Sequence, residues 1–325
     1  MSCTPSQLSV IRGDTLKPAP QISWMQNNPS HTGFRLRIQN IRRQVEDRLE
    51  VLLEDGGNAP PNLLAAMKHA LLGGGKRFRP LLFILTVPQG SHQDAALDIG
   101  CALEMVHTAS LILDDLPCMD DADLRRDKPT THKVFGQATA ILAAISLLTR
   151  GMNTIASLHG VPGDKRARLV SVLSQAVGHT GLAAGQEVDL TEAPEFPMDV
   201  EQKNWLKTGI FFLAMAEMAS ILSDRSEEET AGLSELAFHI GSAFQALDDL
   251  LDATAVPGSL GKDIGKDVGK STMINDRGEA GTRLCYLSHL ELANAALARC
   301  GVEQEPICIL LQSIHQMAFG NDAPV

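Results

Sequence analysis

The chain has 325 residues, of which 44% are hydrophobic and 4% aromatic, and its formal net charge at pH 7 is −11. A negative charge of this size repels nucleic-acid phosphates on average, so a nucleic-acid-binding protein is not expected. Leu, Ala and Met are good helix formers, and with so few aromatic residues the composition favours helices over strands. The six cysteines form no CxxC pair and no zinc-like spacing, so reduced thiols are expected.

The first 33 residues contain four prolines and many polar residues without a sustained period, which predicts a flexible tail over residues 1–33. Residues 34–325 are then predicted to form one large helical domain. No stretch reaches the roughly 20 apolar residues that span a bilayer, and no secretory signal pattern precedes them. We therefore expect a cytoplasmic protein that does not span a membrane.

Helical periodicity begins at Phe34, because apolar residues recur at spacings near 3.6 from Leu36 to Leu52. A second helix is expected over Asn62–Leu72, with Asn62 as its N-cap. Later segments are long enough for several helical turns, and no alternating run predicts a sheet. The fold class is therefore all-α. The predicted breaks lie at residues 73–75, 88–92, 117, 127–129, 160–164, 193–197, 224–228 and 256–270.

Two clusters of aspartates lie in apolar segments with helical spacing. The first is in HTASLILDDLPCMDD, residues 107–121, and the second is in FQALDDLLD, residues 244–252. Residues three, four and seven apart share a helix face, so each cluster has its acids at one end of an apolar stripe. Such carboxylates need cations, and several of them around a diphosphate suit magnesium. A solvated helix end could explain one cluster more readily than two.

Several short basic motifs could supply the fixed positive charge that a diphosphate needs. GGGKRFRP at residues 73–80 places three cations after a glycine turn, and an arginine pair at residues 125–126 follows the first acidic cluster. Lys207 stands within an otherwise apolar segment, and glycine-spaced lysines occupy residues 262–270. Arginine gives bidentate phosphate contacts and lysine a compact point charge.

With these motifs in this order, the sequence resembles the trans-isoprenyl diphosphate synthases, most closely the bacterial carotenoid-type geranylgeranyl diphosphate synthases. The resemblance covers residues 62–271 and rests on GGGKRFRP, HTASLILDDLPCMDDADLRR, GQEVDL, LKTG, FQALDDLLD and GKD. It implies an all-α fold around a deep central cavity, a homodimer, and a requirement for several magnesium ions per active site. It also implies condensation of isopentenyl diphosphate with dimethylallyl, geranyl or farnesyl diphosphate.

The resemblance implies the following roles for individual residues. The magnesium ligands would be Asp114, Asp120 and Asp248, supported by Asp115, Asp121, Asp249 and Asp252. Isopentenyl diphosphate would be held by Lys76, Arg79, His107 and Arg126. The allylic diphosphate would be held by Arg125, Lys207 and Lys262. Thr208 and Gln245 would lie near the developing allylic cation, with Lys207 beside them.

Product length is expected to depend on two small residues one turn before Asp114, which are Ala109 and Ser110. Related farnesyl synthases carry an aromatic residue at the Ala109 position, so geranylgeranyl diphosphate (C20) is favoured over farnesyl diphosphate (C15). Pro117 and Cys118 resemble an insertion found in some bacterial members and should end the helix there.

Three other readings stay open from the sequence. They are a farnesyl diphosphate synthase, a class I terpene cyclase and a non-catalytic subunit of a heteromeric synthase. A cyclase would not need GGGKRFRP, and such subunits tend to lose one acidic motif. Asp127 departs from the family pattern, because glycine usually follows the arginine pair, and this leaves the conformation of its loop open.

Overall fold

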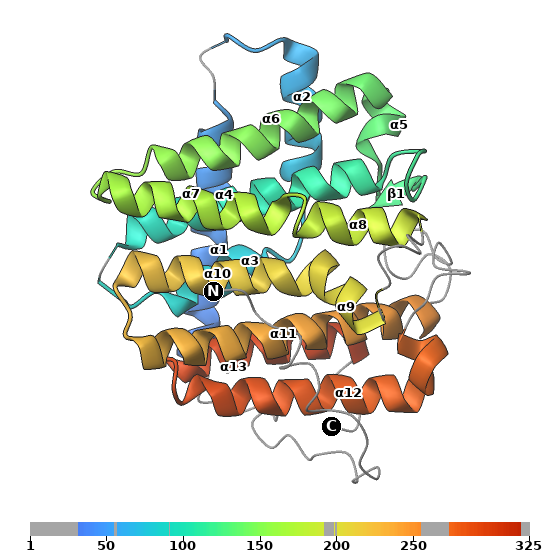
Figure 1. Cartoon of the computed structure of the whole chain (residues 1–325). Coiled ribbons are helices and arrows are strands. Elements are labelled where there is room, and N and C mark those ends of the chain that lie inside the picture. Colours follow the sequence, from blue (N-terminus) through green and yellow to red (C-terminus); the bar gives the residue numbers. More distant parts are fainter. Residues whose placement is uncertain are drawn as a thin grey trace.

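The computed structural model describes residues 32–54, 57–90, 92–191, 198, 200–254 and 273–319 (Figure 1). The first helices are α1 (Thr32–Leu53), α2 (Pro61–Leu71), α3 (Phe78–Thr86) and α4 (Gln93–Asp114). A pair of two-residue strands follows, β1 (Leu124–Arg125) and β2 (Lys128–Pro129). The next helices are α5 (Thr131–Phe135), α6 (Gln137–Ala156), α7 (Gly163–Val177), α8 (Leu182–Thr191) and α9 (Val200–Asn204). A π-helical turn (Trp205–Gly209) leads into α10 (Ile210–Ser223), followed by α11 (Glu227–Thr254), α12 (Met273–Leu297) and α13 (Gln304–Phe319).

The helices stack in rows from α6 at one edge of the molecule to α12 at the opposite edge (Figure 1). Helix α4 runs through the interior, where it packs against α3 and α6, and α11 packs against α10 and α12. The π-helical turn at Trp205–Gly209 packs against both α8 and α11. The predicted all-α class is confirmed, although the sequence did not indicate the short β1–β2 pair.

The apolar core is continuous from α1 to α13. In α1 the buried residues are Ile41, Val45, Leu49 and Leu53, which form the stripe that the periodicity predicted. Leu36 lies outside that stripe and is 55% exposed. Complete burial of a leucine such as Leu49 stabilises the folded state by about 1.5–3 kcal/mol.

Some predicted boundaries were wrong. Helix α1 begins at Thr32, before the predicted start at residue 34. Helix α2 begins at Pro61 without a side-chain cap, so Asn62 is not the N-cap. Proline suits this first helical position, because its fixed φ is compatible with a helix and the missing N–H has no helical partner. All five cysteines among the described residues are free thiols, as expected.

Three helical segments are long and apolar enough to cross a membrane by length and composition, which the sequence reading had excluded. They are Gln93–Asp114, Gln137–Ala156 and Gln202–Ser223. Neighbouring helices bury 67% and 61% of the most apolar windows in the first and third segments. The corresponding value for α6 is only 39%, so this helix has the least covered apolar surface of the three.

Candidate active site

The first acidic cluster lies in a loop that folds back on the end of α4. The helix ends at Asp114, before Pro117, as expected for a residue that cannot continue a helix. The backbone N–H of Asp120 donates to the carbonyl oxygen of Asp114 at 2.9 Å. The backbone N–H of Ala122 donates to that of Asp115 at 3.2 Å. These two bonds bring Asp120 beside Asp114 although six positions separate them.

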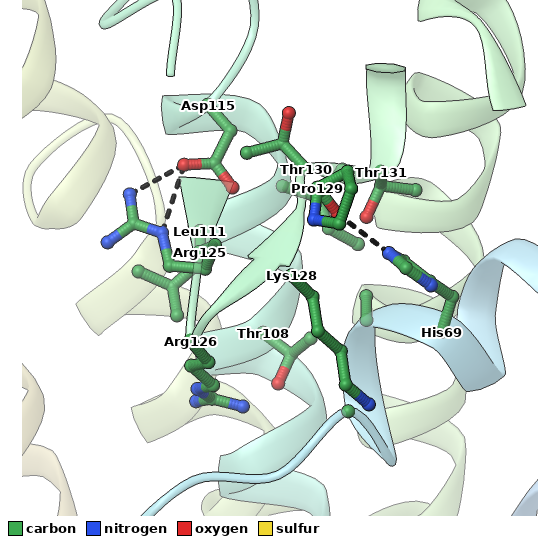
Figure 2. A pocket seen from close by; sticks show the side chains of 13 residues that line it. His69, Thr108, Leu111, Asp115, Arg125, Arg126, Lys128, Pro129, Thr130 and Thr131 are labelled. Atoms are coloured by element: carbon green, nitrogen blue, oxygen red, sulfur yellow. Dashed lines mark hydrogen bonds and ion pairs between the residues drawn. The ribbon is translucent and has the colours of Figure 1, made fainter. Parts of the chain in front are cut away.

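Two carboxylates at the start of this loop, those of Asp114 and Asp115, are buried enough to disfavour their ionisation. Burial raises the pKa of Asp114 to about 6, with Lys207 opposing the rise and Asp120 adding to it. Burial also raises the pKa of Asp115, although Arg125 stabilises its ionised form. Arg125 donates to Oδ1 of Asp115 from Nη2 at 2.5 Å and from Nε at 3.0 Å (Figure 2). The predicted allylic-diphosphate ligand Arg125 therefore contacts a predicted metal ligand.

The β1–β2 pair presents the arginine pair, with two residues at its turn. Arg126 and Asp127 have φ angles of 57° and 61°, so both occupy the left-handed region. Two consecutive positive φ angles are typical of a hairpin turn that favours glycine. The usual glycine at position 127 thus has a physical reason, and Asp127 is strained there. Between this hairpin, α2 and α4 lies a small open pocket, whose lining includes Arg125, Arg126 and Lys128 (Figure 2).

Two of the residues predicted to hold isopentenyl diphosphate, Arg79 and His107, contact each other directly. Nη1 of Arg79 lies 3.2 Å from Nε2 of His107. Since a guanidinium can only donate, Nε2 of His107 accepts, and the imidazole is neutral. Burial and the neighbouring Arg79 and Arg126 hold the pKa of His107 well below its usual value. The Arg79 guanidinium also lies over the ring of Phe212, 5.2 Å from its centroid.

The glycine turn before these cations fits against Arg126. Gly74 and Gly75 have φ angles of 106° and 131°, which side chains rarely tolerate. Nη1 of Arg126 donates to the carbonyl oxygen of Gly74 at 2.6 Å. A Cβ on Gly75 would lie 2.8 Å from the guanidinium carbon of Arg126. The backbone of this glycine turn therefore lies directly against Arg126 and helps to position its guanidinium.

The second acidic cluster faces the same cations from α11. Asp248 is exposed, and its charge favours the protonated forms of both Lys76 and Arg79, whose pKa values are lowered mainly by burial. Asp249 instead makes a hydrogen bond to the start of α12, because its Oδ2 accepts a hydrogen bond from the backbone N–H of Met273 at 2.7 Å. Asp252 is half-buried. The predicted residue Lys262 lies outside the described residues.

A π-helical turn presents Lys207 and Thr208 between the two acidic clusters. Nζ of Lys207 donates to Oδ2 of Asp189 on α8 at 2.7 Å. The hydroxyl of Thr208 donates to Oε1 of Gln245 on α11 at 3.1 Å, and Gln245 donates to Oδ1 of Asp249 at 2.9 Å. Single π-turns inside α-helices occur often at functional sites. Here the turn brings the three predicted residues Lys207, Thr208 and Gln245 together.

Two glycines let neighbouring helices pack closely against this turn. A Cβ on Gly185 of α8 would lie 2.9 Å from the backbone nitrogen of Lys207. A Cβ on Gly241 of α11 would lie 2.9 Å from the Cα of Gly209. Both distances are shorter than side-chain carbons tolerate, so the backbones approach as closely as only glycine permits.

The carboxylates fit magnesium only in combination with substrate. Within the described ranges, no group of three or more acidic, His or Cys side chains converges on one point. Magnesium is usually bound through one or two carboxylates together with substrate phosphates. The charge of Asp120 disfavours ionisation of the neighbouring Asp114, and a divalent cation would relieve this repulsion. Either acidic cluster could therefore hold magnesium once a diphosphate completes its coordination.

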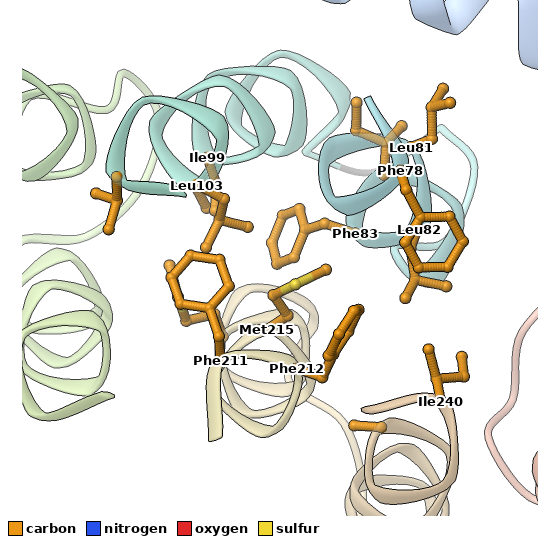
Figure 3. Close-up of a cluster of buried hydrophobic side chains, with 14 of the residues drawn as sticks. Phe78, Leu81, Leu82, Phe83, Ile99, Leu103, Phe211, Phe212, Met215 and Ile240 are labelled. Atoms are coloured by element: carbon orange, nitrogen blue, oxygen red, sulfur yellow. The ribbon is translucent and has the colours of Figure 1, made fainter. Parts of the chain in front are cut away.

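The interior beside α4 is filled by apolar side chains, with Phe83 lying between Ile99, Leu103 and Met215 (Figure 3). Ala109 is only 3% exposed, so almost no water-sized space adjoins its methyl group. Ser110 is half-buried, and its hydroxyl donates to the carbonyl oxygen of His107 at 2.8 Å. The open depth expected of a central cavity is therefore not seen at Ala109, and a long prenyl chain would require neighbouring side chains to move.

Sequence reasoning missed two acids that hold predicted site residues. Asp189 belongs to the quoted motif GQEVDL, yet no role was assigned to it. Its spacing from Lys207 gives no signal, because the contact depends on how α8 packs against the π-turn. Glu104, three positions before His107, was not considered, yet it is 2% exposed and pairs with Arg77. A glutamate in an otherwise apolar run was the available signal.

Comparisons with known proteins identify the family of this chain. The sequence pattern of the polyprenyl synthetase family matches residues 60–274. A geranylgeranyl diphosphate synthase from Pseudescherichia vulneris is 41% identical over 265 residues, covering 80% of this chain and 85% of its own. A farnesyl diphosphate synthase from Bacillus subtilis is 40% identical over 233 residues, covering 70% and 78%.

Solved structures of related enzymes superpose on this fold. Geranyltransferase from Legionella pneumophila is 30% identical with a TM-score of 0.75, covering 89% of this chain and 98% of its own. Geranyltransferase from Helicobacter pylori, solved with magnesium and isoprenyl diphosphate, is 27% identical with a TM-score of 0.76, covering 90% and 98%. The extent and order of these matches show that this chain belongs to the polyprenyl synthetase family.

Proposed function

We propose that this trans-prenyltransferase condenses isopentenyl diphosphate with allylic diphosphates to give geranylgeranyl diphosphate. The observation that carries the proposal is the arrangement of two acidic clusters, on α4 and α11, around one group of cations. Asp248 acts electrostatically on Lys76 and Arg79, while Lys207 and Arg125 act on Asp114. A site for two diphosphates needs both sets of charges. Geranylgeranyl diphosphate synthases among the relatives support the C20 product.

The two diphosphates are assigned to neighbouring positions. Lys76, Arg79, His107 and Arg126 hold isopentenyl diphosphate, while Arg125 and Lys207 hold the allylic diphosphate together with Lys262. The contact between Arg79 and His107 supports the first group, because a neutral imidazole beside a guanidinium leaves the guanidinium's other donors for phosphate oxygens. The contact between Lys207 and Asp189 supports the second group, because it fixes the ammonium beside Asp114.

The reaction follows from charge placement and needs no nucleophilic side chain. Magnesium, several ions of which we expect at Asp114, Asp120 and Asp248, would neutralise charge on the departing diphosphate when bound. Arg125 and Lys207 stabilise that same developing charge, so the allylic C–O bond ionises. Thr208 and Gln245, joined at 3.1 Å, present oxygen dipoles to the allylic cation.

The carbon–carbon bond then forms when the double bond of isopentenyl diphosphate attacks the cation. A proton leaves the resulting carbocation, and we assign its uptake to the released diphosphate, the strongest base close to it. Apolar side chains around Ala109 exclude the water that would otherwise quench the cation.

We further propose a homodimer that uses the outer face of α6. Ile141, Leu142 and Ile145 are 40%, 54% and 51% exposed, and Val134 of the adjoining α5 is 49% exposed. The three α6 residues lie three or four positions apart or adjacent, so they form one apolar stripe on this helix, which lies at one edge of the molecule (Figure 1). Apolar stripes of this kind mark interfaces more often than they face water. Leu142→Glu should dissociate the dimer, as measured by sedimentation velocity.

The reaction class can be tested with labelled isopentenyl diphosphate and the purified chain. Incorporation of label into a prenyl product that requires both an allylic primer and magnesium, and that EDTA abolishes, is expected. A hydrocarbon formed from farnesyl or geranylgeranyl diphosphate alone would indicate a terpene cyclase. Complete inactivity that a second subunit restores would indicate a non-catalytic partner.

A further inference from the structure

Arg77 connects four helices although it belongs to none of the assigned substrate contacts. It is 1% exposed and has a left-handed φ of 50° immediately before α3. Its Nε and Nη2 donate to the two carboxylate oxygens of Glu46 on α1, at 2.8 and 3.0 Å. Its Nη1 donates to Glu104 on α4 at 2.8 Å, and its Nη2 to the carbonyl oxygen of Leu71 on α2 at 2.7 Å.

Glu104 brings this buried pair into the group of cations assigned to isopentenyl diphosphate. It is 2% exposed and lies three residues before His107, on the same face of α4. The oxygen that accepts from Arg77 also lies 3.7 Å from Nη2 of Arg126. Its charge favours the protonated form of Arg79, too. One buried carboxylate thus interacts with three arginines.

These arginines would repel one another without a negative charge between them. Burial, with a contribution from the neighbouring Arg126, lowers the pKa of Arg79 to about 10. A buried charge is costly unless it is paired and hydrogen-bonded. Before a diphosphate arrives, Glu104 is the group that offsets this repulsion from inside the core. Glu46 offsets part of it from α1, where its side chain is 34% exposed.

We propose that Glu104 is a positioning residue that assembles the isopentenyl diphosphate site through Arg77 and Arg126. Its contact with Arg77 fixes the start of α3, from which Lys76 and Arg79 extend, and its charge keeps Arg126 close to them. The inference rests on the proposed function, because it assigns these cations to the non-allylic diphosphate. A negative charge at this place has a second consequence, because it also competes with the ligand for the arginines.

The two consequences predict opposite results for Glu104→Gln, which keeps the side chain's shape and removes its charge. If positioning dominates, as we expect, KM for isopentenyl diphosphate rises about tenfold, while KM for the allylic substrate changes less than about twofold. If Glu104 acts only as a competing charge, KM for isopentenyl diphosphate falls, and the proposal is overturned. Equal changes in both KM values would show a general structural role and would overturn it as well.

Glu46→Gln is the matched control, because it removes a carboxylate from Arg77 but none that lies within ion-pair distance of Arg126. We expect it to raise KM for isopentenyl diphosphate less than about threefold. An effect as large as that of Glu104→Gln would assign the role to Arg77 alone and contradict the part given to Glu104. If circular dichroism shows that Glu104→Gln does not fold, Glu104→Asp is the second variant. It keeps the negative charge on a side chain one methylene shorter, which lies farther from Arg77 and Arg126. We expect a selective rise in KM for isopentenyl diphosphate in this variant as well.

Calorimetry separates this inference from the proposed function. Binding of isopentenyl diphosphate to the wild-type chain and to Glu104→Gln is measured without an allylic substrate, so it does not depend on turnover. A wild-type chain that shows no condensation would contradict the proposed function. An active wild-type chain with equal binding in the variant would contradict only the role of Glu104.

Discussion

Nζ of Lys207 lies 2.7 Å from Oδ2 of Asp189, and this ion pair joins the π-helical turn to α8. The side chains of Lys207 and Asp189 are 30% and 12% exposed, so solvent only partly screens their interaction. The pair holds a flexible lysine at the edge of the first acidic cluster, where its charge stabilises the ionised form of Asp114.

Asp189→Asn should release Lys207 from this position. We expect kcat to fall about tenfold with a rise in KM for the allylic substrate, because a hydrogen bond to a charged group is worth roughly 1.5–3 kcal/mol. Steady-state kinetics with each substrate varied in turn would measure this. Glu187→Gln, at an exposed position on the same helix, is the control and should behave like the wild type. Normal kinetics in the Asp189 variant would show that Lys207 is positioned by other contacts.

Gly185→Ala should displace the π-turn without changing any charge. The added methyl would meet the backbone nitrogen of Lys207 at 2.9 Å, so α8 or the turn must move. Misplacement of positioning groups by about 1 Å can cost on the order of 100-fold in rate, and we expect at least a tenfold loss of kcat. Gly163→Ala serves as the control, since the nearest atom to the added methyl would be the flexible guanidinium tip of Arg166 at 3.8 Å. Equal activity of both variants would refute the close-packing explanation.

Ala109→Tyr should shorten the product from C20 to C15. Ala109 is 3% exposed beside a filled core, so a phenol ring there would block the rearrangement of neighbouring side chains that a growing chain requires. Overpacking should also lower the free energy of unfolding by about 1–3 kcal/mol. Product chromatography and thermal unfolding measure the two effects. Ser110→Ala keeps a small residue and should leave product length unchanged. A C20 product from the tyrosine variant would place the limit on chain length elsewhere.

Asp127→Gly should stabilise the protein. Asp127 has a φ of 61° at the hairpin turn, where glycine has no steric penalty. We expect an increase of about 0.5–1 kcal/mol in the free energy of unfolding, or roughly 2 °C in Tm. Asp127→Ala retains the Cβ and should show no gain. Equal melting temperatures for all three proteins would mean that the turn relaxes without cost.

Much of this site was predictable from local sequence. Short motifs, and the family resemblance that they carry, pointed to Asp114, Asp120, Asp248, Lys207 and Arg126, and their individual roles stay predictions. The contacts that position these residues could not be predicted, because Asp189 meets Lys207 only through the packing of α8. Asp127 was recognised as a departure from the glycine that is usual in the family, but its positive φ could not be predicted from the sequence. Likewise, the filled interior at Ala109 depends on side chains from several helices.

Acid should destabilise the protein through a pair of buried histidines. Nδ1 of His239 on α11 lies 3.0 Å from Nδ1 of His289 on α12. Burial lowers both pKa values, that of His289 to about 3, while Glu235 opposes the change at His239 and Arg277 adds to it at His289. Between pH 6.5 and 3 the unfolded chain therefore binds more protons than the folded one, so stability falls as pH decreases.

We expect His289 to lower the free energy of unfolding by at most about 1.4 kcal/mol for each pH unit below 6.5. Urea unfolding at several pH values, compared with His289→Asn, measures its contribution. The variant should be less stable at neutral pH but should show a shallower decline on acidification. Parallel pH profiles for both proteins would show that His289 does not contribute to acid sensitivity.

In the proposed function, the two acidic clusters and one group of cations bind two diphosphates, and the enzyme condenses them into a C20 product. The most direct test is chromatography of the dephosphorylated product made by the purified chain from isopentenyl diphosphate and dimethylallyl, geranyl or farnesyl diphosphate. We predict geranylgeraniol from each primer when magnesium is present, and none with EDTA. Farnesol as the final product would contradict the assigned length, and the absence of any condensation product would contradict the account of the site.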